Sequence, residues 1–177
     1  MQSRTPHQRA AGHDPLRVDI EARLSEELAA VVIGARRRAL RDGDRQIDTA
    51  HLLHTLLESA PEVRAPFDSD SQVARLLGYL VQRSIGYGLR WQSSVEDSGA
   101  IPTVTEDGWS PVAVGALEVA YERALRRGDE RAGAVDLLAA IVAEPESRAV
   151  EVLGRAGVDV AALLARIDAA AGQGIEA

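Results

Sequence analysis

The chain of 177 residues contains no cysteine and no lysine, and only 3% of its residues are aromatic. Without cysteine, disulfides, thiol catalysis and cysteine-ligated metal sites are excluded. Without lysine, the phosphate loop of nucleotide-hydrolysing enzymes is excluded as well. No apolar run approaches the roughly eighteen residues of a membrane-spanning helix, and residues 1–15 lack the apolar segment of a secretory signal. We therefore expect a cytoplasmic protein with no membrane partner.

Charge and apolar content narrow the possible functions and the fold class further. The 27 Asp and Glu residues outnumber the 20 Arg residues, which gives a net charge of −7. This acidity argues against nucleic-acid binding, because such binding needs clustered cations that displace counterions from phosphates. Hydrophobic residues make up 46% of the chain, which is enough for a packed core. The abundance of alanine, which costs no side-chain entropy in a helix, favours an all-α protein.

The chain contains an internal duplication. Residues 25–58 align with residues 110–143 without a gap, at a constant offset of 85 residues. Both copies contain Ala-Leu-Arg, then Gly-Asp, then a Leu-Leu pair. A later segment, 71–78, resembles 147–154 at an offset of 76, so the first copy has extra residues in between. That stretch, 59–70, contains two prolines and is expected to be a loop.

Helix start and stop signals recur in both copies. Ser25 and Ser110 are typical N-cap residues, and Pro111 suits the first position of a helix. Gly43 and Gly128 can adopt the left-handed conformation that ends a helix. These signals predict one helix from about residue 25 to 42 and an equivalent helix from about 110 to 127.

Apolar spacing supports these helices and predicts further ones. The expected stripe of the first helix consists of Leu28, Val32, Ala35 and Ala39. A second helix is expected to begin near Asp48 and to present its leucines on one face: Leu52, Leu53, Leu56 and Leu57. The second copy repeats this pattern, and a last helix is expected to begin near Asp159, after Gly157.

We therefore predict about eight helices, arranged as two four-helix repeats that pack face to face with pseudo-twofold symmetry. Each repeat alone would be too small to bury much surface. The expected organisation is a flexible tail at 1–15 and one domain over 16–171. Within that domain, repeat one spans about 24–91, an acidic linker about 92–108 and repeat two about 109–171. The last helix of repeat one, over 83–91, is expected to be distorted because two glycines weaken it.

The paired pattern resembles the double-repeat N-terminal domain of Clp-type AAA+ unfoldases. In that family an aliphatic-Gly-Thr-Glu-His-Leu-Leu signature opens the second helix of each repeat. Here residues 47–53 read Ile-Asp-Thr-Ala-His-Leu-Leu, and residues 132–138 read Ala-Gly-Ala-Val-Asp-Leu-Leu. Segment 149–164 is similar to the family's closing helix pair, and the resemblance covers roughly residues 24–170. It implies an all-α binding domain, here without the ATPase modules that follow it in the unfoldases.

The resemblance implies a function in regulated proteolysis. We expect a non-catalytic module, without cofactor or metal, that binds a Clp ATPase, an adaptor or a substrate polypeptide, or that competes with an unfoldase for them. The groove between the repeats is the expected recognition surface. Its expected residues are Thr49, Ala50, Ala134, Val135, Tyr87 and Trp91. Tyr and Trp are enriched at binding hot spots, although these two could instead fill the interface between the repeats.

One departure from the family has a specific consequence. Some members hold phosphorylated arginine with the Glu of the signature in each repeat. Those positions are Ala50 and Val135 here. Because both acidic partners of a guanidinium group are missing, we predict that phosphoarginine is not recognised in the family's manner.

The other polar motifs favour structural roles. His51 and His54 have a spacing that metals can use, but no third ligand is evident, and His51 occupies the histidine position of the signature. The arginines at 36–38 fan around a helix and are expected to be solvated. Asp44 and Asp129 follow the helix-ending glycines and are expected to be turn residues.

Two other classes of function remain open. One is a sequestering protein for a small molecule or a cyclic peptide, because N-terminal domains of this family can be targets of cyclic-peptide natural products. The other is an enzyme with an unrecognised site. Against an enzyme, the sequence contains no Gly-x-Ser-x-Gly motif and singles out no pair of carboxylates for acid–base chemistry.

Overall fold

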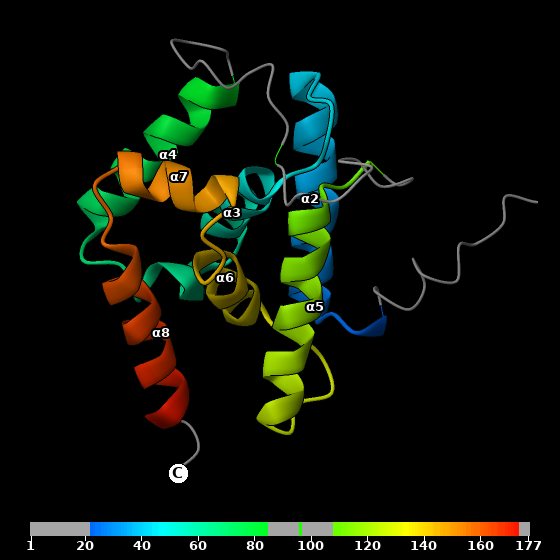
Figure 1. The fold of residues 1–177 in the computed structure, drawn as a ribbon, viewed down its shortest axis with the longest axis vertical. Coiled ribbons are helices and arrows are strands. Elements are labelled where there is room, and N and C mark those ends of the chain that lie inside the picture. The colour runs from blue at the N-terminus through cyan, green and yellow to red at the C-terminus, as the bar shows by residue number, and fades with distance from the viewer. Residues whose placement is uncertain (1–21, 85–95, 97–107, 174–177) are drawn as a thin grey trace, which may run out of the picture.

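The computed structural model describes residues 22–84, 96 and 108–173. Within these residues the chain forms seven α-helices, one short 3-10 helix and no strand, which confirms the all-α class (Figure 1). The helices are α2 Glu26–Asp42, α3 Thr49–Ser59, the 3-10 helix η1 Pro61–Arg64, α4 Asp70–Ser84, α5 Pro111–Arg126, α6 Ala134–Val142, α7 Arg148–Arg155 and α8 Val160–Gln173. The predicted tail at 1–15 and the predicted helix distortion at 86–88 lie outside the described residues.

The boundaries of the long helices follow the signals that the sequence contains. The hydroxyls of Ser25 and Ser110 accept the backbone N–H three residues further on, at 3.1 and 2.9 Å. Gly43 and Gly128 adopt positive φ angles of 68° and 85°, a conformation that costs glycine little. Both cap predictions are therefore confirmed, and they place α2 and α5 at equivalent positions of the two repeats.

Two short backbone contacts show the pseudo-twofold symmetry directly. Leu24 forms an isolated parallel bridge with Ala132, and Ile47 forms one with Trp109. Adding the offset of 85 to Leu24 and Ile47 gives residues 109 and 132, so each bridge is the symmetry mate of the other. Each repeat thus pairs the residue before the N-cap of its first helix with the start of the other repeat's signature.

Helices α3 and α6 lie at the centre of the molecule, between the α2/α5 pair and the group of α4, α7 and α8 (Figure 1). Every residue from 49 to 57 in α3 is buried, and only Val135 in α6 is partly exposed. The four leucines of α3 share one face, as expected, and the opposite face is buried as well, because this helix has neighbours on all sides. Full burial of each leucine contributes about 1.5–3 kcal/mol.

Two further expectations need correction. The buried stripe of α2 contains Val31, whereas Val32 is partly exposed. The stretch between α3 and α4 is not only a loop: Pro61 begins the 3-10 helix η1, and Val63 within it is fully buried. No described helix is long and apolar enough to cross a bilayer.

Candidate functional site

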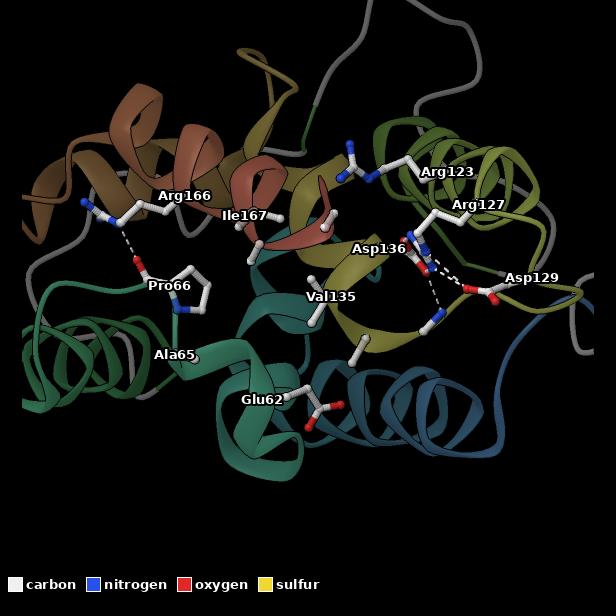
Figure 2. A pocket seen from close by; sticks show the side chains of 14 residues that line it. Glu62, Ala65, Pro66, Arg123, Arg127, Asp129, Val135, Asp136, Arg166 and Ile167 are labelled. Atoms are coloured by element: carbon white, nitrogen blue, oxygen red, sulfur yellow. Dashed lines mark hydrogen bonds and ion pairs between the residues drawn. The ribbon is translucent and has the colours of Figure 1, made fainter. Parts of the chain in front are cut away.

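A cleft of about 710 Å³ opens beside the start of α6, between η1, α5 and α8 (Figure 2). It is lined by Glu62, Ala65, Pro66, Arg123, Arg127, Asp129, Gly133, Ala134, Val135, Asp136, Arg166, Ile167, Ala170 and Ala171. Val135 and Ile167 lie between two charged ends of the cleft. Half of the lining is aliphatic or proline, and the other half, apart from one glycine, is charged.

The arginines at the two ends are internally paired. At one end, Arg127 contacts the carboxylates of Asp136 and Asp129, with Nη2 2.8 Å from an oxygen of each. The hydrogen bond with Asp136 raises the pKa of the Arg127 guanidinium, so this group stays charged. At the other end, Arg166 Nε donates to the Pro66 carbonyl at 2.5 Å.

The carboxylate that holds Arg127 comes from Asp136, in the first turn of α6. Asp136 Oδ2 accepts the N–H of Gly133 at 2.9 Å, which satisfies one of the unpaired backbone donors of the helix N-terminus. The same carboxylate, 3% exposed, then binds Arg127. The first turn of α6 thus holds both its own cap and the guanidinium, and the partly exposed Val135 lies beside them in the cleft.

The six predicted site residues fall into three groups. Ala134 and Val135 line the cleft. Thr49 and Ala50 are fully buried at the equivalent turn of repeat one and line no described cleft. Tyr87 and Trp91 lie outside the described residues.

The turn of repeat one is occupied instead by Glu96, a linker residue. Its carboxylate accepts the N–H of Thr49 at 3.1 Å, the hydroxyl of Ser110 at 2.5 Å and the N–H of Arg148 at 2.6 Å, besides the Thr49 hydroxyl. Burial raises the pKa of the Glu96 carboxyl, and the charge of Asp48 raises it further, against these hydrogen bonds. The sequence contains no signal for this placement, since Glu96 is one acid among several in an acidic stretch.

Histidine at the first signature has a structural role. Asp48 Oδ1 accepts the N–H of His51, and His51 Nδ1 accepts the N–H of Asp48, each at 3.0 Å. This reciprocal capping box satisfies two donors at the start of α3. His51 Nε2 lies 2.6 Å from a carboxylate oxygen of Asp44, so Asp44 does more than shape the turn.

The arginines at 36–38 do point in different directions, but they are not all solvated. Arg38, 13% exposed, pairs with Glu58 and lies 3.2 Å from His54 Nε2. Arg36 lies over the Trp109 ring, 5.9 Å from its centroid. Burial, and then the charge of Arg38, lower the pKa of His54 to about 4, so His54 is neutral near pH 7.

Among the described residues, one group has the spacing of metal ligands: Asp42, Asp44 and His51, at the turn between α2 and α3. Two carboxylates therefore lie beside His51 at a spacing that could hold a metal ion. His54, the other half of the predicted histidine pair, is instead engaged by Arg38 and Glu58.

Comparisons with known proteins place the fold. Residues 110–176 match the Clp repeat (R) N-terminal domain family. The Hsp104 N-terminal domain from Candida albicans matches with a TM-score of 0.61 and 12% identity, over 81% of this chain and 88% of that one. The N-terminal domain of the ClpD chaperone from Arabidopsis thaliana matches with a TM-score of 0.58 and 19% identity, over 85% and 95%. The comparison with curated proteins gives no significant match.

Proposed function

We propose that this chain, which has the fold of Clp and Hsp104 N-terminal domains, is a protein-interaction module that binds polypeptide segments in the cleft beside α6. The occupant is an extended segment with small aliphatic side chains, supplied by a substrate or an adaptor of a Clp unfoldase. By binding such segments the module assists the unfoldase or competes with its own N-terminal domain. It works without cofactor and without catalysis.

The observation that carries this proposal is the composition of the cleft. Its middle is aliphatic, with Val135 at the position where the related signature has Glu. Its arginines are paired with carboxylates, so an apolar segment can enter without leaving a guanidinium unpaired. The lining contains no Ser, Thr, Cys, His or Tyr, the side chains that supply most nucleophiles, which supports binding over chemistry.

The alternative of a sequestered small molecule is supported by one observation, the size of the cleft. About 710 Å³ lies within the roughly 300–1,000 Å³ of small-ligand pockets. A compact cyclic peptide rich in aliphatic residues would use the same lining. The two candidates differ in whether linear segments bind, and the experiment below separates them.

The test uses fluorescence anisotropy with short labelled peptides that differ in aliphatic content. We expect aliphatic linear peptides to bind the full chain. Val135→Glu should lower their affinity at least about tenfold, because a bound aliphatic peptide would remove water from the new carboxylate. Glutamate suits the first turn of a helix, so the fold is kept. The matched control is Val119→Glu on α5, at a side chain that is 42% exposed and outside the cleft.

Three results would contradict the proposal. Equal binding by wild type and Val135→Glu would place the site elsewhere. Binding of cyclic but not linear peptides would favour sequestration of a small ligand. Cleavage of the peptides, retained after repurification, would show an enzyme. The link to Clp is tested by affinity capture from host cytosol with and without ATP, where a Clp ATPase, adaptor or substrate should be recovered by wild type and reduced with Val135→Glu.

A further inference from the structure

The charged cluster at the second signature turn has a counterpart in repeat one that lacks its cation. In repeat two, Arg127 bridges the carboxylates of Asp129 and Asp136. At the offset of 85 residues these three positions become Asp42, Asp44 and His51. A carboxylate therefore stands where the second repeat has a guanidinium, and the cluster loses the cation that holds its partners together.

The three side chains nevertheless converge. One carboxylate oxygen of Asp42, one of Asp44 and a ring nitrogen of His51 all lie within 4.8 Å of one another. The Asp42 side chain is only 6% exposed, and its Oδ2 is buried without a hydrogen-bond partner. Its other oxygen has only a long contact, 3.4 Å from Arg41 Nε. Such a buried, unsatisfied carboxylate oxygen costs about 1–3 kcal/mol or more, and a bound cation removes that cost.

The surroundings of His51 suit metal ligation. Metal-binding histidines usually donate the hydrogen of their second ring nitrogen to a carboxylate. In the metal-free fold Nδ1 accepts the Asp48 N–H. A metal on Nε2 would place the ring hydrogen on Nδ1, where Asp48 Oδ1, 2.9 Å away, can accept it at the cost of that capping bond. Nε2 itself lies beside Asp44, whose side chain is 31% exposed and leaves a path from solvent.

We propose that Asp42, Asp44 and His51 form a binding site for a divalent first-row transition metal, best represented by Zn²⁺. One imidazole nitrogen and two carboxylate oxygens are ordinary zinc ligands, and three protein ligands leave a fourth position for water. Calcium fits poorly, because it takes six to eight oxygen ligands. The ion would join the end of α2 to the start of α3, as Arg127 joins the corresponding elements of repeat two.

The test is a titration of the metal-free full chain with Zn²⁺ against a chromophoric chelator, together with thermal unfolding with and without Zn²⁺. Wild type should bind one ion at this site and be stabilised by it. Asp42→Asn keeps the shape but removes a charged ligand. It should weaken zinc binding about 100-fold, which is the largest loss usual for a residue that only supports a metal ligand. The matched control is Asp129→Asn in repeat two, which should leave zinc binding unchanged.

A second variant tests the comparison between the repeats. Asp42→Arg places the guanidinium of repeat two in repeat one, and it should abolish both zinc binding and stabilisation by zinc. Equal zinc affinity in wild type and Asp42→Asn, both folded by circular dichroism, would overturn the proposal and assign the ion to other groups, such as His7 and His13. Absence of saturable binding by wild type would overturn it as well.

Discussion

The two repeats begin their second helices in the same way but surround them differently. In both, a side chain in the first turn accepts the backbone N–H just before the helix: His51 for Asp48 in repeat one, and Asp136 for Gly133 in repeat two. Beside this shared cap, repeat two places Arg127 among two carboxylates, whereas repeat one has an acid, Asp42, in place of the arginine. Satisfaction of the helix N-terminus is thus fixed by the fold, while the neighbouring charges can diverge.

The access to the two turns differs as well. Thr49 and Ala50 of repeat one are covered, and Glu96 binds the backbone there. Ala134 and Val135 of repeat two face a cleft that α8 and η1 help to form. The duplicated unit therefore has one turn used inside the protein and one turn that lines a cleft. This division supports placing the binding function in repeat two.

The largest expected effect tests what the repeats share. Leu53 and Leu138 are equivalent, fully buried residues of the central helices. Leu53→Ala and Leu138→Ala should each lower the free energy of unfolding by about 2–5 kcal/mol, because each leaves a cavity in the core. Urea denaturation measures both. A loss under about 1 kcal/mol at only one of the two sites would break the equivalence of the repeats.

The next effect tests the asymmetry at the first turn. Glu96→Ala should lower the free energy of unfolding by about 3 kcal/mol, because the N–H groups of Thr49 and Arg148 and the hydroxyl of Ser110 lose a buried acceptor. Glu96→Gln should cost less, since its amide oxygen can still accept. The measurement is urea denaturation, with Glu62→Ala as the control. If Glu96→Ala were as stable as wild type, Glu96 would not hold the repeats together.

A smaller effect distinguishes the repeats by pH. His54 is equivalent to Ala139 of repeat two, and its folded pKa of about 4 lies below its unfolded value near 6.5. The unfolded chain therefore binds the proton first, and stability is lost as the pH falls through this window. The difference in unfolding free energy between wild type and His54→Ala should shrink by about 2 kcal/mol from about pH 7 to about pH 5. Glu96, whose pKa shift acts in the opposite direction, cancels in this difference.

That difference in stability should stay constant over the same range if His54 is not held neutral in the fold. Such a result would mean that Glu58, which lies 3.1 Å from His54 Nε2, compensates for the burial of the ring.

The smallest expected effect is a lack of specific phosphoarginine binding. Neither signature turn has the acid that would pair with a guanidinium, since Ala50 and Val135 stand there. Free phosphoarginine should therefore bind no better than arginine or phosphate in isothermal titration. Micromolar binding of phosphoarginine that is competed by peptides bound in the cleft would show that another group replaces the missing acids.

Much of the scaffold could be predicted from the sequence because its signals are local. Ser25, Ser110, Gly43 and Gly128 mark helix ends through their own backbone contacts, and the offset of 85 residues predicts the symmetry. Periodicity located α3 and its leucine face but not the burial of its opposite face, because that burial depends on neighbours from other parts of the chain. The placement of Glu96 and the contribution of η1 and α8 to the cleft depend on contacts between residues far apart in the chain, which no local pattern encodes.

The most direct test of the account is methyl NMR of the full chain with a bound aliphatic peptide. The account predicts that shift changes concentrate on Ala134, Val135 and Ile167, while the methyls of Thr49 and Ala50 remain unchanged. Changes that concentrate on Thr49 and Ala50, with Val135 unaffected, would contradict it and place recognition at the turn of repeat one.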